Sequence, residues 1–210
     1  LRAWGLGEDA FLVGINMNAG EFALRRAWPP EKFIVLAQRL EDRGCKTVFV
    51  GGAGEELYVT RHVKHMEAKP VNLAGRTSVR QLAAILAEMK FLVTNDSGPL
   101  HLAAALGIPT VSLFGPESPA RFGPPRSDLH AVVTAEPECG PCVSLLAGER
   151  RDCERGQTCL RTLPVSRVMG AVEEMLRFLD DRERLKRIAA RRQAKKPRIV
   201  EGQGTLFPAT

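Results

Sequence analysis

The sequence predicts an α/β fold built on a doubly wound parallel sheet with helices on both faces. Its short apolar runs are continuous rather than alternating, as in strands that are buried on both faces. Segments of about ten residues with helical spacing of apolar side chains separate these runs. Hydrophobic residues make up 44% and charged residues 26% of the 210-residue chain, which is typical of a globular protein and excludes disordered and fibrous classes.

Six segments have the composition of strands, and turn residues or helix starts bound them. The first ends in the polar stretch from Asn16 to Gly20, and the second closes at Gly51-Gly52. The expected strands are residues 11–16, 46–50, 71–73, 91–94, 110–114 and 128–134.

Helix starts and stops lie between these strands. Pro29-Pro30 opens the first helix and Gly44 ends it. Ser78 caps a later helix. The expected buried stripe of that helix consists of Val79, Leu82, Ala83, Ile85 and Leu86. Further helices are expected at residues 54–66, 98–106 and 164–181.

The chain is expected to contain one folded domain with short extensions. Residues 1–10 are interpreted as the end of an interdomain linker, and residues 11–181 as the domain, including a cysteine-rich loop at 139–159. The apolar run at 100–114 is too short to span a membrane. The sequence begins at Leu1 without an initiator Met or a secretion signal, so we expect a fragment of a longer protein.

The net charge of +6 belongs to the C-terminal tail, residues 182–210. Residues 182–200 contain nine basic residues and one acid, a net charge of +8, which leaves −2 for the rest of the chain. The domain therefore lacks the charge of a nucleic-acid-binding protein, and we expect no nucleic-acid partner. The tail is predicted to be disordered. It is either a solvated extension or, through a helix-compatible run at residues 183–196, a segment that contacts anionic lipid.

The strongest candidate site follows the fourth expected strand. Ligands of open parallel sheets bind beyond the carboxyl ends of the strands. There Asp96-Ser97-Gly98 leads into a helix, whose free N–H groups suit a diphosphate, and Gly98 lets a ligand approach the backbone. His101 on the first turn could reach the same ligand, whereas Asp96 better suits sugar hydroxyls. The alternative is that Asp96 or Ser97 merely caps the helix and His101 is a surface histidine.

Two more loops carry candidate ligand-binding residues. Arg25 and Arg26 follow the flexible segment Asn18-Ala19-Gly20, and arginine is a bidentate partner for phosphate. Glu55 and Glu56 resemble the acid that binds a ribose hydroxyl in nucleotide-binding folds. The alternatives are a pair of solvated charges and acids at a helix start.

Four of the five cysteines lie close together in the sequence, at Cys139, Cys142, Cys153 and Cys159. The spacing is compatible with four thiolates around one zinc ion, although five residues between the last two is wide for a zinc knuckle. A disulfide or redox-sensitive pair and simple packing of a structured loop remain open. Cys45, just before a strand, is expected to be a buried apolar thiol.

The densest group of motifs resembles the signature of the lipopolysaccharide heptosyltransferases, glycosyltransferase family 9. The signature residues are Asn95-Asp96-Ser97-Gly98, His101, Ala103-Ala104-Ala105, Gly107-Ile108-Pro109, Leu113-Phe114-Gly115 and Pro119. Supporting segments are Arg26-Ala27-Trp28-Pro29, residues 51–55, residues 72–78 and the cysteine pattern. The resemblance covers residues 10–180 in the order of the family.

The resemblance implies the C-terminal, donor-binding half of a GT-B glycosyltransferase, in which two Rossmann-like domains face each other. The donor would be ADP-L-glycero-β-D-manno-heptose and the acceptor the lipopolysaccharide core or lipid A. Transfer would invert the anomeric centre without a metal ion or other cofactor. The enzyme would be cytoplasmic, peripheral to the inner membrane of a Gram-negative bacterium.

By position, the resemblance also implies the roles of the donor-binding residues. Asp96 would hold sugar hydroxyls, and Ser97, Gly98 and His101 would cradle the diphosphate. Arg26 would neutralise phosphate charge as ADP leaves, Glu55 or Glu56 would bind the ribose, and Thr77-Ser78 would lie near the base. The whole set of donor-binding candidates is Asn18, Gly20, Arg26, Glu55, Glu56, Thr77, Ser78, Asp96, Ser97, Gly98 and His101.

Two features depart from the family pattern. Arg26 stands where the family usually has lysine, which keeps the charge and changes its geometry. The family's catalytic base is an Asp of the N-terminal domain, so no base can be named here and the isolated chain is expected to be inactive. The alternatives are a related GT-B enzyme with another nucleotide sugar and a non-catalytic nucleotide- or metal-binding module.

Overall fold

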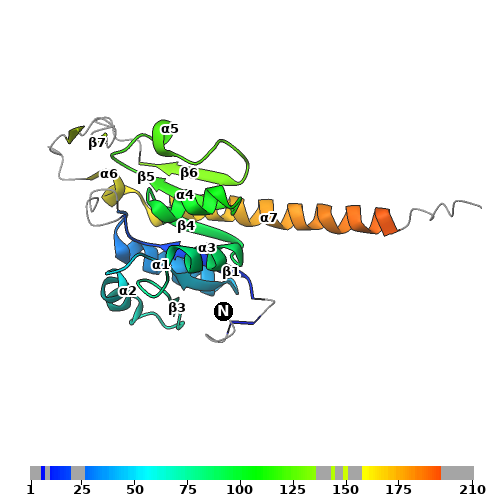
Figure 1. The fold of residues 1–210 in the computed structure, drawn as a ribbon, viewed down its shortest axis with the longest axis horizontal. Coiled ribbons are helices and arrows are strands. Elements are labelled where there is room, and N and C mark those ends of the chain that lie inside the picture. The colour runs from blue at the N-terminus through cyan, green and yellow to red at the C-terminus, as the bar shows by residue number, and fades with distance from the viewer. Residues whose placement is uncertain are drawn as a thin grey trace, which may run out of the picture. The chain divides into compact units, whose positions relative to one another are not determined.

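The computed structural model describes residues 6–7, 10–19, 27–135, 143–144, 149–150 and 158–194. It divides into two compact units, Leu1–Met175 and Leu176–Thr210. The first unit is built around a six-stranded sheet in the order β3-β2-β1-β4-β5-β6, and every neighbouring pair is parallel (Figure 1). The predicted doubly wound α/β fold is therefore confirmed.

All six predicted strands form, with small shifts at their ends. Their bounds are β1 Leu12–Asn16, β2 Lys46–Phe49, β3 Val71–Asn72, β4 Phe91–Asn95, β5 Thr110–Phe114 and β6 His130–Thr134. The two-residue strands β7 Val143–Ser144 and β8 Glu149–Arg150 pair antiparallel within the segment expected to be a cysteine-rich loop.

The helices follow the predicted order. Those that sequence analysis predicted are α1 Pro30–Glu41, α2 Glu56–Val63, α3 Val79–Ala87, α4 Gly98–Ala105 and α7 Val165–Ala194. Two short helices, α5 Pro119–Phe122 and α6 Thr158–Thr162, were not predicted. Because α2 starts at Glu56, the preceding Glu55 lies at its N-cap rather than inside the helix.

The two faces of the sheet are covered by different helices. One hydrophobic cluster joins Leu12 and Leu92 of the sheet to Leu82 and Leu86 of α3 and to Ala103 of α4. On the other face, Trp28 contacts Phe33 of α1 edge-to-face, with ring centroids 4.9 Å apart. Residues on alternate positions of β1 and β4 thus face α3 and α4 on one side and α1 on the other.

The capped start of α3 agrees with the prediction, but its buried stripe is narrower. The Ser78 Oγ accepts a hydrogen bond from the Gln81 N–H at 3.3 Å, and the Gln81 Oε1 accepts one from the Ser78 N–H at 2.9 Å. Leu82 and Leu86 are buried, whereas Val79 is 74% exposed. The prediction that Val79 belongs to the stripe was wrong, because the first residue of the helix projects past the edge of the cluster.

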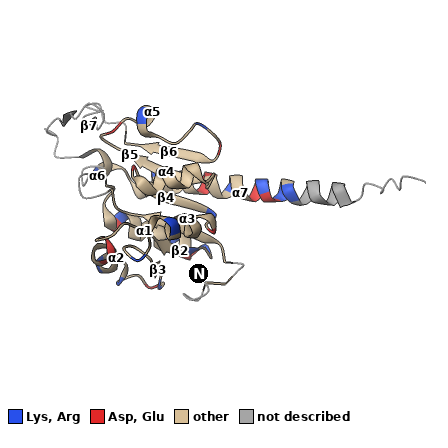
Figure 2. Cartoon of the chain, in the orientation of Figure 1, with Lys and Arg blue, Asp and Glu red and all other residues tan. Residues whose placement is uncertain are grey.

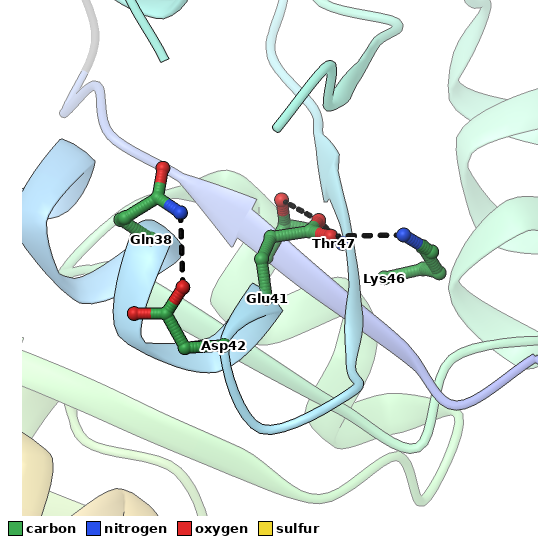
Figure 3. A network of polar contacts seen from close by, with 5 residues as sticks. All are labelled: Gln38, Glu41, Asp42, Lys46 and Thr47. Atoms are coloured by element: carbon green, nitrogen blue, oxygen red, sulfur yellow. Dashed lines mark hydrogen bonds and ion pairs between the residues drawn. The ribbon is translucent and has the colours of Figure 1, made fainter. Parts of the chain in front are cut away.

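Glu41 holds the start of β2 through a small polar network (Figure 3). One carboxylate oxygen, Oε1, accepts hydrogen bonds from the Thr47 N–H at 2.6 Å and the Thr47 hydroxyl at 2.7 Å. The other oxygen, Oε2, pairs with Lys46 Nζ at 3.2 Å. This network lies at the amino end of the strand, the edge opposite to the candidate site, so we assign it a structural role. The nearby Cys45 is buried as predicted, and burial raises the pKa of its thiol.

The helix α7 runs beyond its predicted end. It was expected to stop at Asp181, but it continues to Ala194, so residues 182–194 are helical rather than disordered. This segment lacks Gly and Pro and is rich in Arg, Lys, Glu, Leu and Ala, which favour helices even when exposed. Basic and acidic residues alternate along its described part (Figure 2). The rest of the predicted tail, residues 195–210, lies outside the described residues.

Candidate functional site

The junction of β4 and α4 brings three predicted site residues to the carboxyl edge of the sheet. Asp96 follows the fully buried β4, is itself 3% exposed, and donates its N–H to the Leu113 carbonyl of β5 at 3.2 Å. Ser97 is the N-cap of α4 in an extended conformation, and Gly98 begins the helix. The continuous burial of β4 thus fixes where the polar loop begins.

The N-terminus of α4 is not capped by a side chain. The Ser97 hydroxyl lies 3.0 Å from the Thr94 hydroxyl instead, so the simple capping interpretation of Ser97 is not what the structure shows. A Cβ added to Gly98 would meet no atom within 4 Å, and His101 on the first turn is exposed. This helix end therefore offers open space and N–H groups to an anion.

The loop after β2 places Glu55 and Glu56 differently. The Glu55 carboxylate accepts a hydrogen bond from the Gly52 N–H at 2.8 Å and so closes its own turn. Glu56 Oε1 accepts two hydrogen bonds from Arg76, from Nε at 3.0 Å and from Nη2 at 2.7 Å. Both partners of this ion pair are about half exposed. Both acids lie in the segment that follows β2, at the carboxyl edge of the sheet. That one of them binds a ribose hydroxyl stays a prediction.

The loop after β3 lies against the loop after β2. The Gly75 N–H donates to the Gly51 carbonyl at 3.2 Å, and Gly75 has a φ of 73°, a conformation that favours glycine. Ser78 uses its hydroxyl in the capping box of α3, while the Thr77 hydroxyl is buried without a partner. The Ser78 hydroxyl is therefore already hydrogen-bonded within the protein. That Thr77-Ser78 lies near the nucleotide base stays a prediction from its position in the sequence.

One buried amide, Asn95, was missed by sequence analysis and joins the end of β4 to both ends of the loop after β1. Asn95 Oδ1 accepts a hydrogen bond from the Trp28 N–H at 2.9 Å, and its Nδ2 donates to the Met17 carbonyl at 3.0 Å. Met17 and Trp28 stand on either side of the loop that contains Arg25 and Arg26 in the sequence. We call Asn95 and these two backbone partners the Asn95 clamp. In the sequence, the only sign of it is a polar amide at the end of an apolar strand.

Trp28 also anchors the C-terminal part of the first unit. Its indole Nε1 donates to the Leu163 carbonyl at 2.9 Å. Lys32 Nζ donates to the same carbonyl at 2.8 Å and to the Arg161 carbonyl at 2.5 Å. The segment that enters α7 is thereby tied to the start of α1, close to the loop after β1.

The sheet order brings the candidate loops together. Because β1 lies between β2 and β4 and all are parallel, the loops after these strands meet at one edge. The helices that follow β1 and β4 cover opposite faces, which makes this edge the switch point at which such sheets bind ligands. The described candidates at this edge are Asn18, Glu55, Asp96, Ser97, Gly98 and His101, with Glu56 at the start of α2 and Thr77 and Ser78 in the loop after β3.

The remaining predicted site residues lie outside the described residues. These are Gly20, Arg25 and Arg26 of the donor-site candidates and Cys139, Cys142 and Cys153 of the proposed zinc ligands. The fourth cysteine, Cys159, lies in α6, and its Sγ would be 3.2 Å from a Cβ on Gly115 at the end of β5. Within the described ranges, no group of three or more His, Cys, Asp or Glu residues could hold a metal. The zinc interpretation stays a prediction.

The family assignment follows from comparison with known proteins. Residues 12–149 match the family described as glycosyltransferase family 9 (heptosyltransferase). The chain belongs to this family. This family match spans all six strands of the sheet and the whole candidate site edge.

Curated and solved relatives agree with the family match. Lipopolysaccharide heptosyltransferase 2 of Escherichia coli K12 is 39% identical over 135 residues, which cover 62% of this chain and 38% of the relative. The structure of E. coli ADP-heptose LPS heptosyltransferase II matches 87% of this chain and 50% of its own, with 28% identity and a TM-score of 0.67. E. coli heptosyltransferase WaaC with ADP has 25% identity and a TM-score of 0.60, over 82% of this chain and 47% of WaaC.

The chain therefore spans half or less of these relatives. The sheet of this family member matches one half of GT-B heptosyltransferase structures, which confirms the predicted fold class. Among the described helices, none combines the length and apolar character needed to cross a membrane.

Proposed function

We propose that this chain is the donor-binding half of an enzyme that transfers heptose from ADP-L-glycero-β-D-manno-heptose to the lipopolysaccharide core. The observation that carries the proposal is the uncapped N-terminus of α4 beside the buried Asp96, in a chain of glycosyltransferase family 9. A relative described as an ADP-heptose LPS heptosyltransferase and another solved with ADP support this donor.

In this proposal the described residues divide the work of holding the donor. Asp96 accepts hydrogen bonds from hydroxyls of the transferred sugar, while Ser97, Gly98 and His101 surround the diphosphate. A carboxylate repels phosphate but pairs well with hydroxyl donors, and helix N–H groups do the reverse. Glu55 is the acid proposed for the ribose, because Glu56 is held in an ion pair with Arg76, whereas Glu55 accepts a neutral backbone N–H through Oε2.

Transfer is proposed to invert the anomeric carbon without a metal ion. The acceptor hydroxyl oxygen forms the new bond to the anomeric carbon, and the bond from that carbon to the phosphate oxygen breaks. The hydroxyl proton passes to a base in the half that this chain does not include, as the family resemblance implies. The leaving ADP gains negative charge, which the positive end of α4 and Arg26 stabilise.

Nucleotide selectivity tests the proposal directly. Isothermal titration of the 210-residue chain is expected to show binding of ADP that is about ten-fold tighter than binding of UDP or GDP, and no heptose transfer. Tighter binding of UDP or GDP would favour a related enzyme with another nucleotide sugar. Measurable transfer by this chain alone would contradict the assignment of the base to the other half.

We also propose that the basic C-terminal tail, residues 182–210, contacts anionic lipid on the cytoplasmic face of the inner membrane, where the glycolipid acceptor would lie. Arg182, Arg184 and Lys186 are exposed on α7. Basic residues near such a surface contribute about 1 kcal/mol each. Co-sedimentation with vesicles containing anionic lipid is expected to fall on deletion of residues 182–210 and at high salt. Unchanged binding by the shortened chain would exclude this role.

A further inference from the structure

A buried amide at the end of β1 has an oxygen without a hydrogen-bond partner. Asn16 is the last residue of β1 and is 2% exposed. In the described part of the chain, its Oδ1 and the Thr77 hydroxyl are the two buried side-chain oxygens or nitrogens that lack a partner. The large majority of buried side-chain polar atoms in proteins are paired, so an unpaired one requires an explanation.

The position of Asn16 places this oxygen on the α4 side of the sheet. Asn16 is in register with Thr94 of the parallel neighbour β4, so both side chains project from the same face. The Thr94 hydroxyl lies 3.0 Å from the hydroxyl of Ser97, the N-cap of α4. The unpaired oxygen therefore belongs to the row of polar groups that leads to the proposed diphosphate site.

Asn95, at the end of the neighbouring strand, shows what a purely structural amide does here. Both of its polar atoms are used, Oδ1 by the Trp28 N–H and Nδ2 by the Met17 carbonyl. Asn16 has no such protein partner for its oxygen, although its neighbours Ile15 and Met17 are fully buried and apolar. An apolar side chain of similar volume would fill the same space without an unpaired polar atom.

We propose that Asn16 Oδ1 accepts a hydrogen bond from a hydroxyl of the bound nucleotide sugar, an inference that rests on the proposed function. An amide oxygen needs an O–H or N–H donor, which an ionised diphosphate lacks. The groups attached directly to the diphosphate are the ribose and the transferred sugar, and both carry hydroxyls. Since the oxygen is covered in the ligand-free chain, binding must uncover it, by a shift of Asn18 and Ala19 that leaves the Met17 carbonyl bonded to Asn95.

The replacement Asn16→Leu tests this assignment, because the stability of the chain and its affinity for the ligand are expected to change in opposite directions. Without ligand, the variant is expected to unfold at a higher urea concentration than the wild type, because it no longer buries an unpaired oxygen. Its affinity for the ligand is expected to fall about ten-fold, the loss typical of one buried hydrogen bond. A loss for both ADP and ADP-L-glycero-β-D-manno-heptose assigns the ribose hydroxyl. A loss for the nucleotide sugar alone assigns the transferred sugar.

Two further variants keep the test decisive. Asn95→Leu makes the same chemical change at the end of β4, and it is expected to lower the urea midpoint because both of its hydrogen bonds are lost. Asn16→Ala removes the amide without adding bulk and is expected to show the same loss of ligand affinity, about ten-fold. It replaces Asn16→Leu in the test if the leucine variant does not fold.

The possible failures are distinguishable. A wild-type chain that binds neither ADP nor the nucleotide sugar overturns the proposed function and this inference with it. A chain that binds both ligands, and whose Asn16 variants bind them as tightly as the wild type does, overturns only the role of Asn16. A lower urea midpoint for Asn16→Leu with unchanged affinity shows that the amide is structural and also overturns the inference.

Discussion

Replacing Asn95 by leucine is expected to lower the free energy of unfolding by about 2–6 kcal/mol. The side chain is fully buried and satisfies the Trp28 N–H and the Met17 carbonyl. Without it, both backbone groups remain buried and unpaired, and each costs about 1–3 kcal/mol. Urea denaturation of the 210-residue chain, followed by far-ultraviolet circular dichroism, measures the change.

Asn72 provides a matched control for this prediction. At the end of β3, its Oδ1 accepts from the Ala74 N–H at 3.0 Å and its Nδ2 donates to the Thr60 hydroxyl at 3.0 Å. These bonds are partly or fully exposed, so water replaces them, and Asn72→Leu is expected to cost less than about 1 kcal/mol. A loss at Asn95 no larger than that at Asn72 would show that the clamp contributes little.

The clamp also illustrates what could not be predicted from the sequence. Trp28 and Met17 lie 67 and 78 residues from Asn95 along the chain. No local pattern encodes which backbone groups a buried amide will reach, because the strand order determines it. The Asp96-Ser97-Gly98 junction was predictable, since a strand end, an acid and a helix start are adjacent in the sequence.

The strands were predictable because burial on both faces favours consecutive apolar residues, as at Phe91-Leu92-Val93 of β4. The ends of the helices were harder to predict than the strands. The sequence after Asp181 is compatible with both a helix and a disordered charged tail, because its many charges favour solvation while its residues are strong helix formers, and α7 continues to Ala194. The helices α5 and α6 have four and five residues, too few for a periodic pattern to stand out.

The acids near the site show a similar limit. Glu55 and Glu56 are equivalent in the sequence, because each follows Gly51-Gly52 by a few residues. The structure separates them through Arg76, which lies 20 residues away and pairs with Glu56. Asp96 has no second acid beside it in the sequence that could also bind the donor sugar. Its replacement should therefore have the clearest effect on activity.

In the complete enzyme that contains both halves, Asp96→Asn is expected to lower kcat/KM for heptose transfer about a hundred-fold. The substitution keeps the shape of the side chain but removes its negative charge and replaces one of the two oxygens that would accept hydrogen bonds from sugar hydroxyls by an NH2 donor. Because those bonds would hold the sugar and not the nucleotide, the affinity of the 210-residue chain for ADP should change by less than about three-fold. Steady-state kinetics and titration with ADP measure the two effects separately.

The contrast between sugar and nucleotide is what makes this test specific to the proposed role of Asp96. Asp128, an exposed acid before β6, provides the control, and Asp128→Asn is expected to leave both transfer and ADP affinity unchanged. If Asp96→Asn instead weakens ADP binding as much as it slows transfer, the carboxylate acts on the fold of the junction, because a misplaced α4 would affect the diphosphate too. Wild-type kcat/KM in the variant would contradict a role for Asp96 in holding the donor sugar.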